Sequence, residues 1–220
     1  MPSIVIAHFS DTHGLPRKGV PEATDLIVHT GDLFPNRTRG RREIEVPYQT
    51  AWLKKVAGVW RKWAGRRPLI LVNGNHDFID PVPIFREAGI MAVNVEGRVV
   101  DMFGFRFMGM PDIPRMEGEW NHERYEDEIA DHFNEIMSHE PDIIVSHCPP
   151  YGILDKPSPY ENIHIGSTAI ATGLLYGKAP LAYLCGHCHE QGGRKMFLEP
   201  RTIVSNAATT RNMIEVVKPW

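Results

Sequence analysis

Eight side chains with oxygen or nitrogen donor atoms follow five short apolar runs of this 220-residue chain. The runs are 4–9, 26–30, 69–72, 143–146 and 181–185, and the side chains are Asp11, His13, Asp32, Asn75, His76, His147, His187 and His189. Pairs such as Asp11/His13 skip one residue, which points both side chains the same way on an extended backbone. Because the carboxyl ends of strands in an α/β sheet meet at one edge, we expect these side chains to share one cleft.

The mixture of carboxylates and imidazoles indicates a site for transition-metal ions. A buried carboxylate is costly unless it is paired or bound to a metal, and no lysine or arginine stands within these motifs to neutralise Asp11 and Asp32. Mixed carboxylate and imidazole ligands suit Zn, Mn, Fe, Co or Ni, whereas Mg and Ca prefer oxygen alone. The ligands are too many for one tetrahedral ion. We therefore expect two ions, ~3.5–4 Å apart across a bridging carboxylate.

The first half of the chain alternates between strand-like and helix-like hydrophobic patterns. Apolar runs rich in Ile and Val predict buried strands at 3–9, 25–30 and 68–72. Helical spacing predicts helices over 48–64, with Pro47 in the first turn, and over 83–88. This β-α-β order favours a largely parallel sheet.

The second half contributes more strands than one small sheet can hold. Paired strands are expected over 99–109 with a turn near Gly104, followed by a loop over 112–121. The other predicted strands are 142–146, 181–185, 195–198, 202–205 and 213–217, and the predicted helices are 123–138 and 167–175. We expect an α/β fold of two sheets packed face to face with helices outside, in a single domain over residues 1–220.

Composition and charge are those of a soluble globular protein. The residues are 42% hydrophobic and 23% charged, and a net charge of −3 provides no basic field for nucleic acid or anionic lipid. No apolar run approaches the ~18 residues of a membrane helix, and the N-terminus has no secretory signal pattern. Three cysteines do not suit a disulfide framework. We therefore expect a cytoplasmic protein without membrane or nucleic-acid partners, and its oligomeric state stays open.

Five linked motifs, from about residue 4 to 206, resemble those of the calcineurin-like metallophosphoesterases. They are Asp11-Thr12-His13, Gly31-Asp32, Gly74-Asn75-His76-Asp77, His147 and Gly186-His187-Cys188-His189. The resemblance implies a four-layer α-β-β-α sandwich of two mixed β-sheets flanked by helices. It also implies two metal sites with one shared ligand: Asp11, His13 and His189 for the first ion, Asn75, His147 and His187 for the second, and Asp32 bridging both. By the same resemblance His76 faces the scissile phosphate, and Asp77 orients its ring.

A narrower likeness concerns the small cap-less subfamily that includes the animal metallophosphoesterase-domain-containing brain proteins. The segments 146–152, 186–193 and 109–121 resemble that subfamily, whose members are associated with hydrolysis of phosphodiesters, including cyclic nucleotides. The implied activity is a phosphodiesterase that acts on a small phosphoester through a hydroxide bridging two divalent ions, with Mn favoured among Mn, Fe, Zn, Co and Ni. His76 would either stabilise charge on the phosphate or protonate the leaving group.

Other activities compatible with these residues stay open. A phosphomonoesterase or a phosphoprotein phosphatase would use the same centre, and a nucleotide-binding protein could hold its ligand there without turnover. The run Cys185-Gly186-His187-Cys188-His189 also matches the C-x-x-C of thiol exchange and the C-x-x-C-H of haem attachment. Both of these alternatives leave the four upstream motifs unexplained.

Three further side chains are candidates for substrate binding. Arg41 and Arg42 end an arginine-rich segment soon after Asp32, and they could clamp a phosphate or belong to a solvated loop. His164 could approach the cleft from its own loop. His8 and His29 lie within strand runs, so we expect them to be core residues with hydrogen-bond partners.

Overall fold

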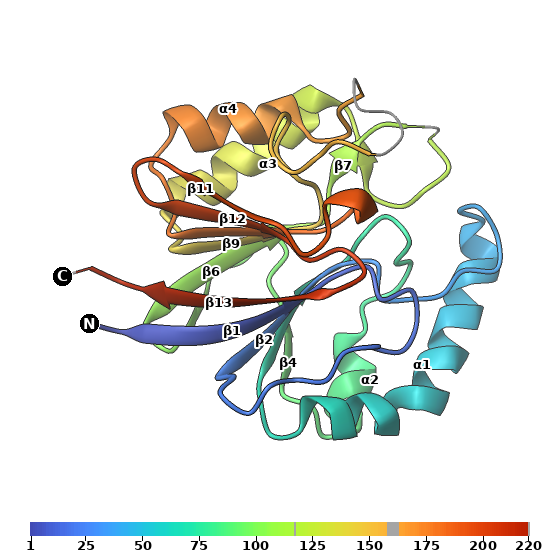
Figure 1. Cartoon of the computed structure of the whole chain (residues 1–220). Coiled ribbons are helices and arrows are strands. Elements are labelled where there is room, and N and C mark those ends of the chain that lie inside the picture. Colours follow the sequence, from blue (N-terminus) through green and yellow to red (C-terminus); the bar gives the residue numbers. More distant parts are fainter. Residues whose placement is uncertain (117, 158–162, 220) are drawn as a thin grey trace.

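The computed structural model describes residues 1–116, 118–157 and 163–219, which fold into four layers (Figure 1). Helices α1 (Arg42–Ala64) and α2 (Val82–Glu87) form one outer layer, and α3 (Glu126–Ser138) and α4 (Thr168–Tyr176) form the other. Two β-sheets lie face to face between these helix layers. The predicted sandwich of two mixed sheets flanked by helices is confirmed.

The first sheet lies next to α1 and α2 and has the strand order β13-β1-β2-β3-β4. Its strands are β1 (Ser3–Phe9), β2 (Leu26–Thr30), β3 (Leu69–Val72), β4 (Ala92–Asn94) and β13 (Arg211–Val217). Strands β1 to β4 are parallel, and β13 pairs antiparallel with β1. Every residue of β2 and β3 is buried, as expected for strands covered on both faces.

The second sheet lies next to α3 and α4 and has the order β11-β12-β10-β9-β6-β5. Its strands are β5 (Val100–Met102), β6 (Phe105–Met110), β9 (Ile143–Ser146), β10 (Ala182–Cys185), β11 (Lys195–Leu198) and β12 (Thr202–Asn206). The four inner strands are parallel and the two edge strands are antiparallel. Two short strands, β7 (Ile113–Pro114) and β8 (Glu123–Arg124), pair with each other.

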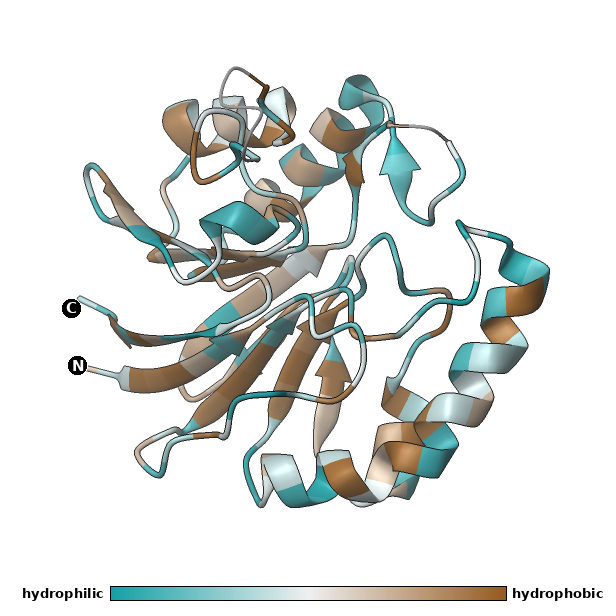
Figure 2. Ribbon diagram, turned by 45° about the vertical axis from the view of Figure 1, so that its right-hand side comes forward, coloured by the Kyte–Doolittle hydropathy of each residue, from teal (hydrophilic) through white to brown (hydrophobic). Residues whose placement is uncertain are grey.

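Apolar side chains fill the spaces between the layers, and the inner strands of the two large sheets are mostly hydrophobic (Figure 2). The core between the sheets includes Ile6, Val28, Phe107, Val145 and Leu184. Under the first helix layer, Trp60 packs against Phe85 with ring centroids 5.5 Å apart. Phe133 of α3 packs against Tyr183 of the second sheet. Within the described residues, no helix is long and apolar enough to cross a membrane.

Two helices start elsewhere than the sequence pattern predicts, and three short strands were not predicted: β4, β7 and β8. Strand β7 lies within the segment 112–121, which was predicted to be a loop. Helix α1 begins at Arg42, so the placement of Pro47 in a first turn is wrong and Pro47 lies inside the helix. The extension is stabilised by Glu45, whose carboxylate accepts hydrogen bonds from the backbone N–H groups of Arg37 and Thr38 at 2.9 and 2.6 Å. Helix α3 begins at Glu126 because the two preceding residues of the predicted helix form β8. Strand β4 has only three residues, too few to show a periodicity.

His8 links the two sheets through its imidazole. Its Nδ1 atom lies 3.0 Å from the hydroxyl of Ser205 in the second sheet, and its Nε2 atom lies 3.0 Å from the hydroxyl of Thr30 in the first. The side chain is fully buried, and burial lowers the pKa of His8 from 6.5 to about 3. The folded protein therefore holds His8 as neutral imidazole, as predicted for a core histidine.

This burial predicts acid destabilisation of the metal-free protein. Between pH 6.5 and about 3, the unfolded chain binds a proton at His8 that the folded chain does not. The free energy of unfolding therefore falls with decreasing pH, by about 1.4 kcal/mol per pH unit from this group. Urea unfolding at pH 7, 6 and 5, with a chelator present, should show a shallower pH slope for His8→Gln than for the wild type. Parallel slopes would contradict this assignment.

Candidate metal centre

The predicted ligands gather at the carboxyl ends of strands from both sheets. The residues that follow β1, β2, β3, β9 and β10 are, in that order, Asp11 with His13, Asp32, Asn75, His147, and His187 with His189. Backbone hydrogen bonds join neighbouring strand ends: His13 N donates to Asp32 O at 3.0 Å, and Gly186 N donates to His147 O at 3.0 Å. The parallel topology thus brings side chains that are up to 178 residues apart to one place.

Asp11, His13 and His189 form a first group, with ligand atoms within 4.8 Å of one another. Nε2 of His189 lies 3.1 Å from Oδ1 of Asp11 and 3.4 Å from Nε2 of His13. The other oxygen of Asp11 accepts a hydrogen bond from the backbone N–H of His187 at 3.0 Å. One carboxylate oxygen is therefore fixed by the backbone while the other faces two imidazoles, which suits a shared cation.

A second group surrounds His147, whose side chain is fully buried. Its Nδ1 atom donates to Thr30 O at 2.7 Å, which turns Nε2 toward Oδ1 of Asn75 at 3.0 Å. This hydrogen bond fixes the ring orientation that a metal-binding histidine requires. The ring centroid of His187 lies 5.0 Å from that of His147.

Asp32 lies between the two groups. Its Oδ2 atom is 3.8 Å from Nε2 of His13 and 3.5 Å from Nε2 of His147, while Oδ1 accepts a hydrogen bond from the backbone N–H of His76 at 2.8 Å. The structure therefore brings all seven predicted metal ligands into one pocket around Asp32. Their role as ligands stays a prediction.

Four residues of this pocket have backbone conformations that residues other than glycine rarely adopt. Asp11, His13, Asp32 and His187 have φ values of 52°, 42°, 55° and 66°, in the left-handed region. Such strain concentrates at functional sites, where the surrounding structure must hold it. A glycine is required at position 74, because a Cβ there would lie 2.2 Å from Oδ1 of Asp32.

The buried carboxylates of the pocket favour positive charge beside them. Burial by itself raises the pKa of Asp32, but charge on His147 and His76 outweighs burial and holds this pKa well below its usual range. Burial likewise lowers the pKa of His147, but the carboxylate of Asp32 outweighs it and raises the pKa to about 10. A fully buried imidazole thus keeps a proton at neutral pH, and a divalent cation could take the place of that proton. The donor set fits metal ions.

The imidazole of His76 is held beside this pocket by residues that the sequence motifs did not indicate. Its Nδ1 atom donates to Oδ1 of Asn36 at 2.8 Å, and the amide of Asn36 donates back to His76 O at 3.0 Å. The indole of Trp120 stacks on the ring with centroids 4.0 Å apart and a tilt of 38°. Nε2 is left facing Oδ2 of Asp32 at 3.9 Å. Trp120 lies in the predicted loop 112–121, and Asn36 lies in the arginine-rich segment.

Asp77 does not orient the ring of His76, contrary to expectation. Its carboxylate accepts hydrogen bonds from the backbone N–H groups of Phe34 at 3.0 Å and Gly74 at 2.8 Å, so it ties together the loops that carry Asp32 and Asn75. Burial, with a contribution from Asp32, raises the pKa of Asp77 to about 7. Asp77 is therefore a positioning residue for the backbone of the pocket.

The structure does not bring the three predicted substrate-binding residues into the ligand groups. Arg41 and Arg42 stand at the start of α1. Nδ1 of His164 donates to the buried carboxylate of Asp155 at 2.8 Å, and the ring of Tyr151 stacks on its imidazole. Substrate binding by Arg41, Arg42 and His164 stays a prediction.

The burial and the raised pKa values of the cysteine thiols do not support the alternatives based on cysteine chemistry. Cys148, Cys185 and Cys188 are free and buried. Burial raises the pKa of Cys188 to about 12 and that of Cys185 well above its usual value. Thiol exchange requires an accessible thiolate, so these residues serve as small core side chains.

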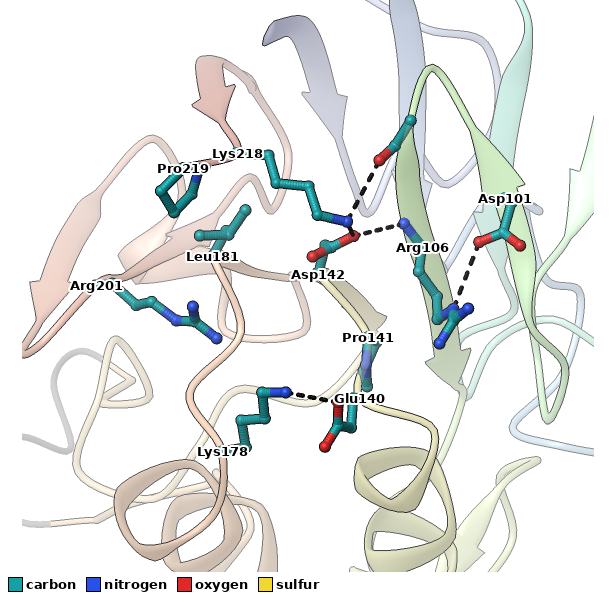
Figure 3. A pocket seen from close by; sticks show the side chains of 11 residues that line it. Asp101, Arg106, Glu140, Pro141, Asp142, Lys178, Leu181, Arg201, Lys218 and Pro219 are labelled. Atoms are coloured by element: carbon teal, nitrogen blue, oxygen red, sulfur yellow. Dashed lines mark hydrogen bonds and ion pairs between the residues drawn. The ribbon is translucent and has the colours of Figure 1, made fainter. Parts of the chain in front are cut away.

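A different hollow of about 390 Å³ lies at the amino ends of the strands of the second sheet, away from the ligands (Figure 3). Its cations are largely neutralised: Lys178 pairs with Glu140, Lys218 with Asp142 at 2.6 Å, and Arg106 with Asp101 at 3.5 Å. It contains none of the candidate metal ligands. The carboxyl ends of the strands are therefore the candidate active site.

Comparison with known proteins gives the class of the chain. The model of the calcineurin-like phosphoesterase family matches residues 4–191, and the chain belongs to this family. A sequence search of curated proteins finds no match.

The fold is similar to a solved structure from Staphylococcus aureus, provisionally described as a 5′-nucleotidase in complex with α-ketoglutarate. The TM-score is 0.57 at 10% identity, and the alignment covers 99% of this chain and 51% of that chain. This chain thus spans about half the length of that protein, and at this identity the likeness shows the fold.

Proposed function

We propose that the protein is a phosphodiesterase that uses two divalent metal ions, preferably Mn, to hydrolyse small phosphodiesters, with cyclic nucleotides as the favoured substrates. The observation that carries this proposal is the convergence of seven candidate ligands around Asp32, with His76 held beside them. The motif likeness to the small cap-less subfamily supports diesters over monoesters. The charge of the pocket supports a bound cation.

The chain's own residues prepare this pocket for a phosphate. Two divalent ions, when bound, would neutralise phosphate oxygens and lower the pKa of a bound water toward ~7. Asn36 occupies Nδ1 of His76, so Nε2 carries a proton only when the ring is doubly protonated. In that form Nε2 can donate to a phosphate oxygen or transfer its proton to the leaving oxygen. Trp120 covers one face of the ring and limits its rotation.

A phosphomonoesterase with the same centre is the second candidate. It is the kind of reaction that the description of the Staphylococcus aureus structure names. The same ligands would serve, because both reactions displace an oxygen from a phosphate. The difference lies in the groups that contact the substrate outside the metal centre.

The proposal is tested with metal-depleted protein reconstituted with Mn²⁺. We expect turnover of bis-p-nitrophenyl phosphate and of at least one 2′,3′- or 3′,5′-cyclic nucleotide, at higher kcat/KM than of p-nitrophenyl phosphate. A preference for the monoester would replace the diesterase assignment by the second candidate. Absence of turnover with Mn²⁺, Fe²⁺, Zn²⁺, Co²⁺ and Ni²⁺ would contradict both.

A further inference from the structure

A hollow of about 250 Å³ opens directly beside the first ligand group. Asp11, His13 and His189 form one wall, and Arg17 and Lys18 contribute to its lining from the segment that follows the first motif. This volume lies below the ~300 Å³ at which sites for whole drug-sized ligands begin. The hollow is therefore suited to one substituent of a substrate whose scissile phosphate lies at the metal centre.

The backbone that carries these two cations is fixed in place. The carbonyl of Lys18 accepts a hydrogen bond from the indole N–H of Trp63 at 2.8 Å, which ties the segment to α1. The carbonyl of Gly19 accepts one from Nη1 of Arg211 at 2.7 Å, which ties it to β13. Gly14 N donates to Leu33 O at 2.9 Å. The side chains of Arg17 and Lys18 are exposed to solvent. The backbone from which they extend is held beside the pocket by these hydrogen bonds.

The charge of this hollow differs from that of the hollow in Figure 3. There, three of the four cations have a carboxylate partner. In the described part of the chain, neither Arg17 nor Lys18 forms an ion pair, and the one carboxylate of their hollow, Asp11, belongs to the candidate metal ligands. Two cations without carboxylate partners create local positive charge on a protein whose net charge is −3. Guanidinium and ammonium groups bind phosphate oxygens through charge-assisted hydrogen bonds.

We propose that this hollow, the Arg17–Lys18 subsite, binds a second phosphate group of the substrate. This inference rests on the proposed function and narrows its substrate class to small phosphodiesters, cyclic nucleotides among them, that carry a further phosphate besides the scissile one. Arg17 and Lys18 act there as specificity-determining residues. The scissile phosphate remains at the metal centre.

The test compares two substrates with the same scissile bond and leaving group, thymidine 5′-(p-nitrophenyl phosphate) and its 3′-phosphorylated analogue. The wild type should hydrolyse the 3′-phosphorylated substrate with at least about tenfold higher kcat/KM, and the advantage should shrink as ionic strength rises, because exposed charges are screened. In Arg17→Ala/Lys18→Ala the ratio of the two kcat/KM values should fall below about twofold. A ratio taken within one variant cancels general changes in activity or metal content.

The matched control is Lys54→Ala/Lys55→Ala, which removes the same charge from the exposed face of α1 and should keep the wild-type ratio. A wild-type ratio near one, or an unchanged ratio in Arg17→Ala/Lys18→Ala, would overturn the inference and leave the proposed function intact. If the ratio of the two kcat/KM values also falls in the control, the preference for the 3′-phosphorylated substrate comes from net charge, and the subsite is overturned. If neither ester is hydrolysed, turnover of bis-p-nitrophenyl phosphate decides on the proposed function, and calorimetry decides on the subsite. Thymidine 3′,5′-bisphosphate must then bind more tightly than thymidine 5′-phosphate, and only when Arg17 and Lys18 are present.

Discussion

Replacing Asp32 by Asn is expected to abolish turnover and to disturb binding of both metal ions. The substitution keeps the shape of the side chain and an oxygen that can accept the hydrogen bond from the backbone of His76. It removes the charge that lies 3.8 Å from His13 and 3.5 Å from His147. Because Asp32 lies against His13 of the first group and His147 of the second, its loss affects both ions. We expect kcat/KM to fall by at least about 10³-fold, equivalent to about 4 kcal/mol of transition-state stabilisation.

Metal analysis after dialysis, together with steady-state kinetics at saturating Mn²⁺, measures this effect. Asp112→Asn is the matched control, because Asp112 is also a buried aspartate after a strand, but it contacts His132 at 2.8 Å rather than the ligand groups. The control should retain two ions per chain. Near-normal, metal-dependent activity of Asp32→Asn would show that Asp32 is not the bridging ligand.

His76→Ala is expected to keep both metal ions and to lose most of kcat. No candidate ligand atom is removed from the two assigned groups, and the backbone N–H that supports Asp32 is retained. What is lost is the imidazole that, when protonated at Nε2, can donate to a phosphate oxygen or to the leaving oxygen, a contribution of ~10²–10⁴-fold. We expect KM for bis-p-nitrophenyl phosphate to change much less than kcat, because the interaction strengthens as charge develops in the transition state.

A second variant separates the chemistry of His76 from its positioning. Asn36→Ala leaves the imidazole in place and removes the acceptor of its Nδ1 proton. Its kcat should fall by about tenfold, well short of the loss in His76→Ala. Equal losses of metal and activity in His76→Ala would instead place His76 among the metal ligands, a possibility consistent with the proximity of His13, Asp32 and His76 ligand atoms.

The sequence predicted the location of the ligands well because their placement follows from simple rules. Asp11, Asp32 and Asn75 each follow an apolar run, and parallel strands present their carboxyl ends at one edge. The buried runs were long enough to be recognised, and the number of strands already required two sheets. Strand β4 was not predicted, because its three residues are too few to show a periodicity.

The surroundings of the ligands could not be predicted in the same way, because they depend on contacts between distant loops. Asn36 reaches His76 from a loop whose next two residues, Arg37 and Thr38, donate backbone hydrogen bonds to Glu45 of α1. Trp120 lies in the long connection between β6 and α3. No local sequence pattern indicates that its indole stacks on His76. Asp77 was assigned to its neighbour His76, but backbone N–H groups at Phe34 and Gly74 lie within reach of its carboxylate and take both its oxygens.

Anomalous diffraction from crystals soaked in Mn²⁺ tests the binuclear centre most directly. We predict two strong peaks, one among Asp11, His13 and His189 and one among Asn75, His147 and His187, with the carboxylate of Asp32 in contact with both. Soaked crystals with no peak among these side chains, or with a single peak elsewhere in the molecule, would contradict the assignment.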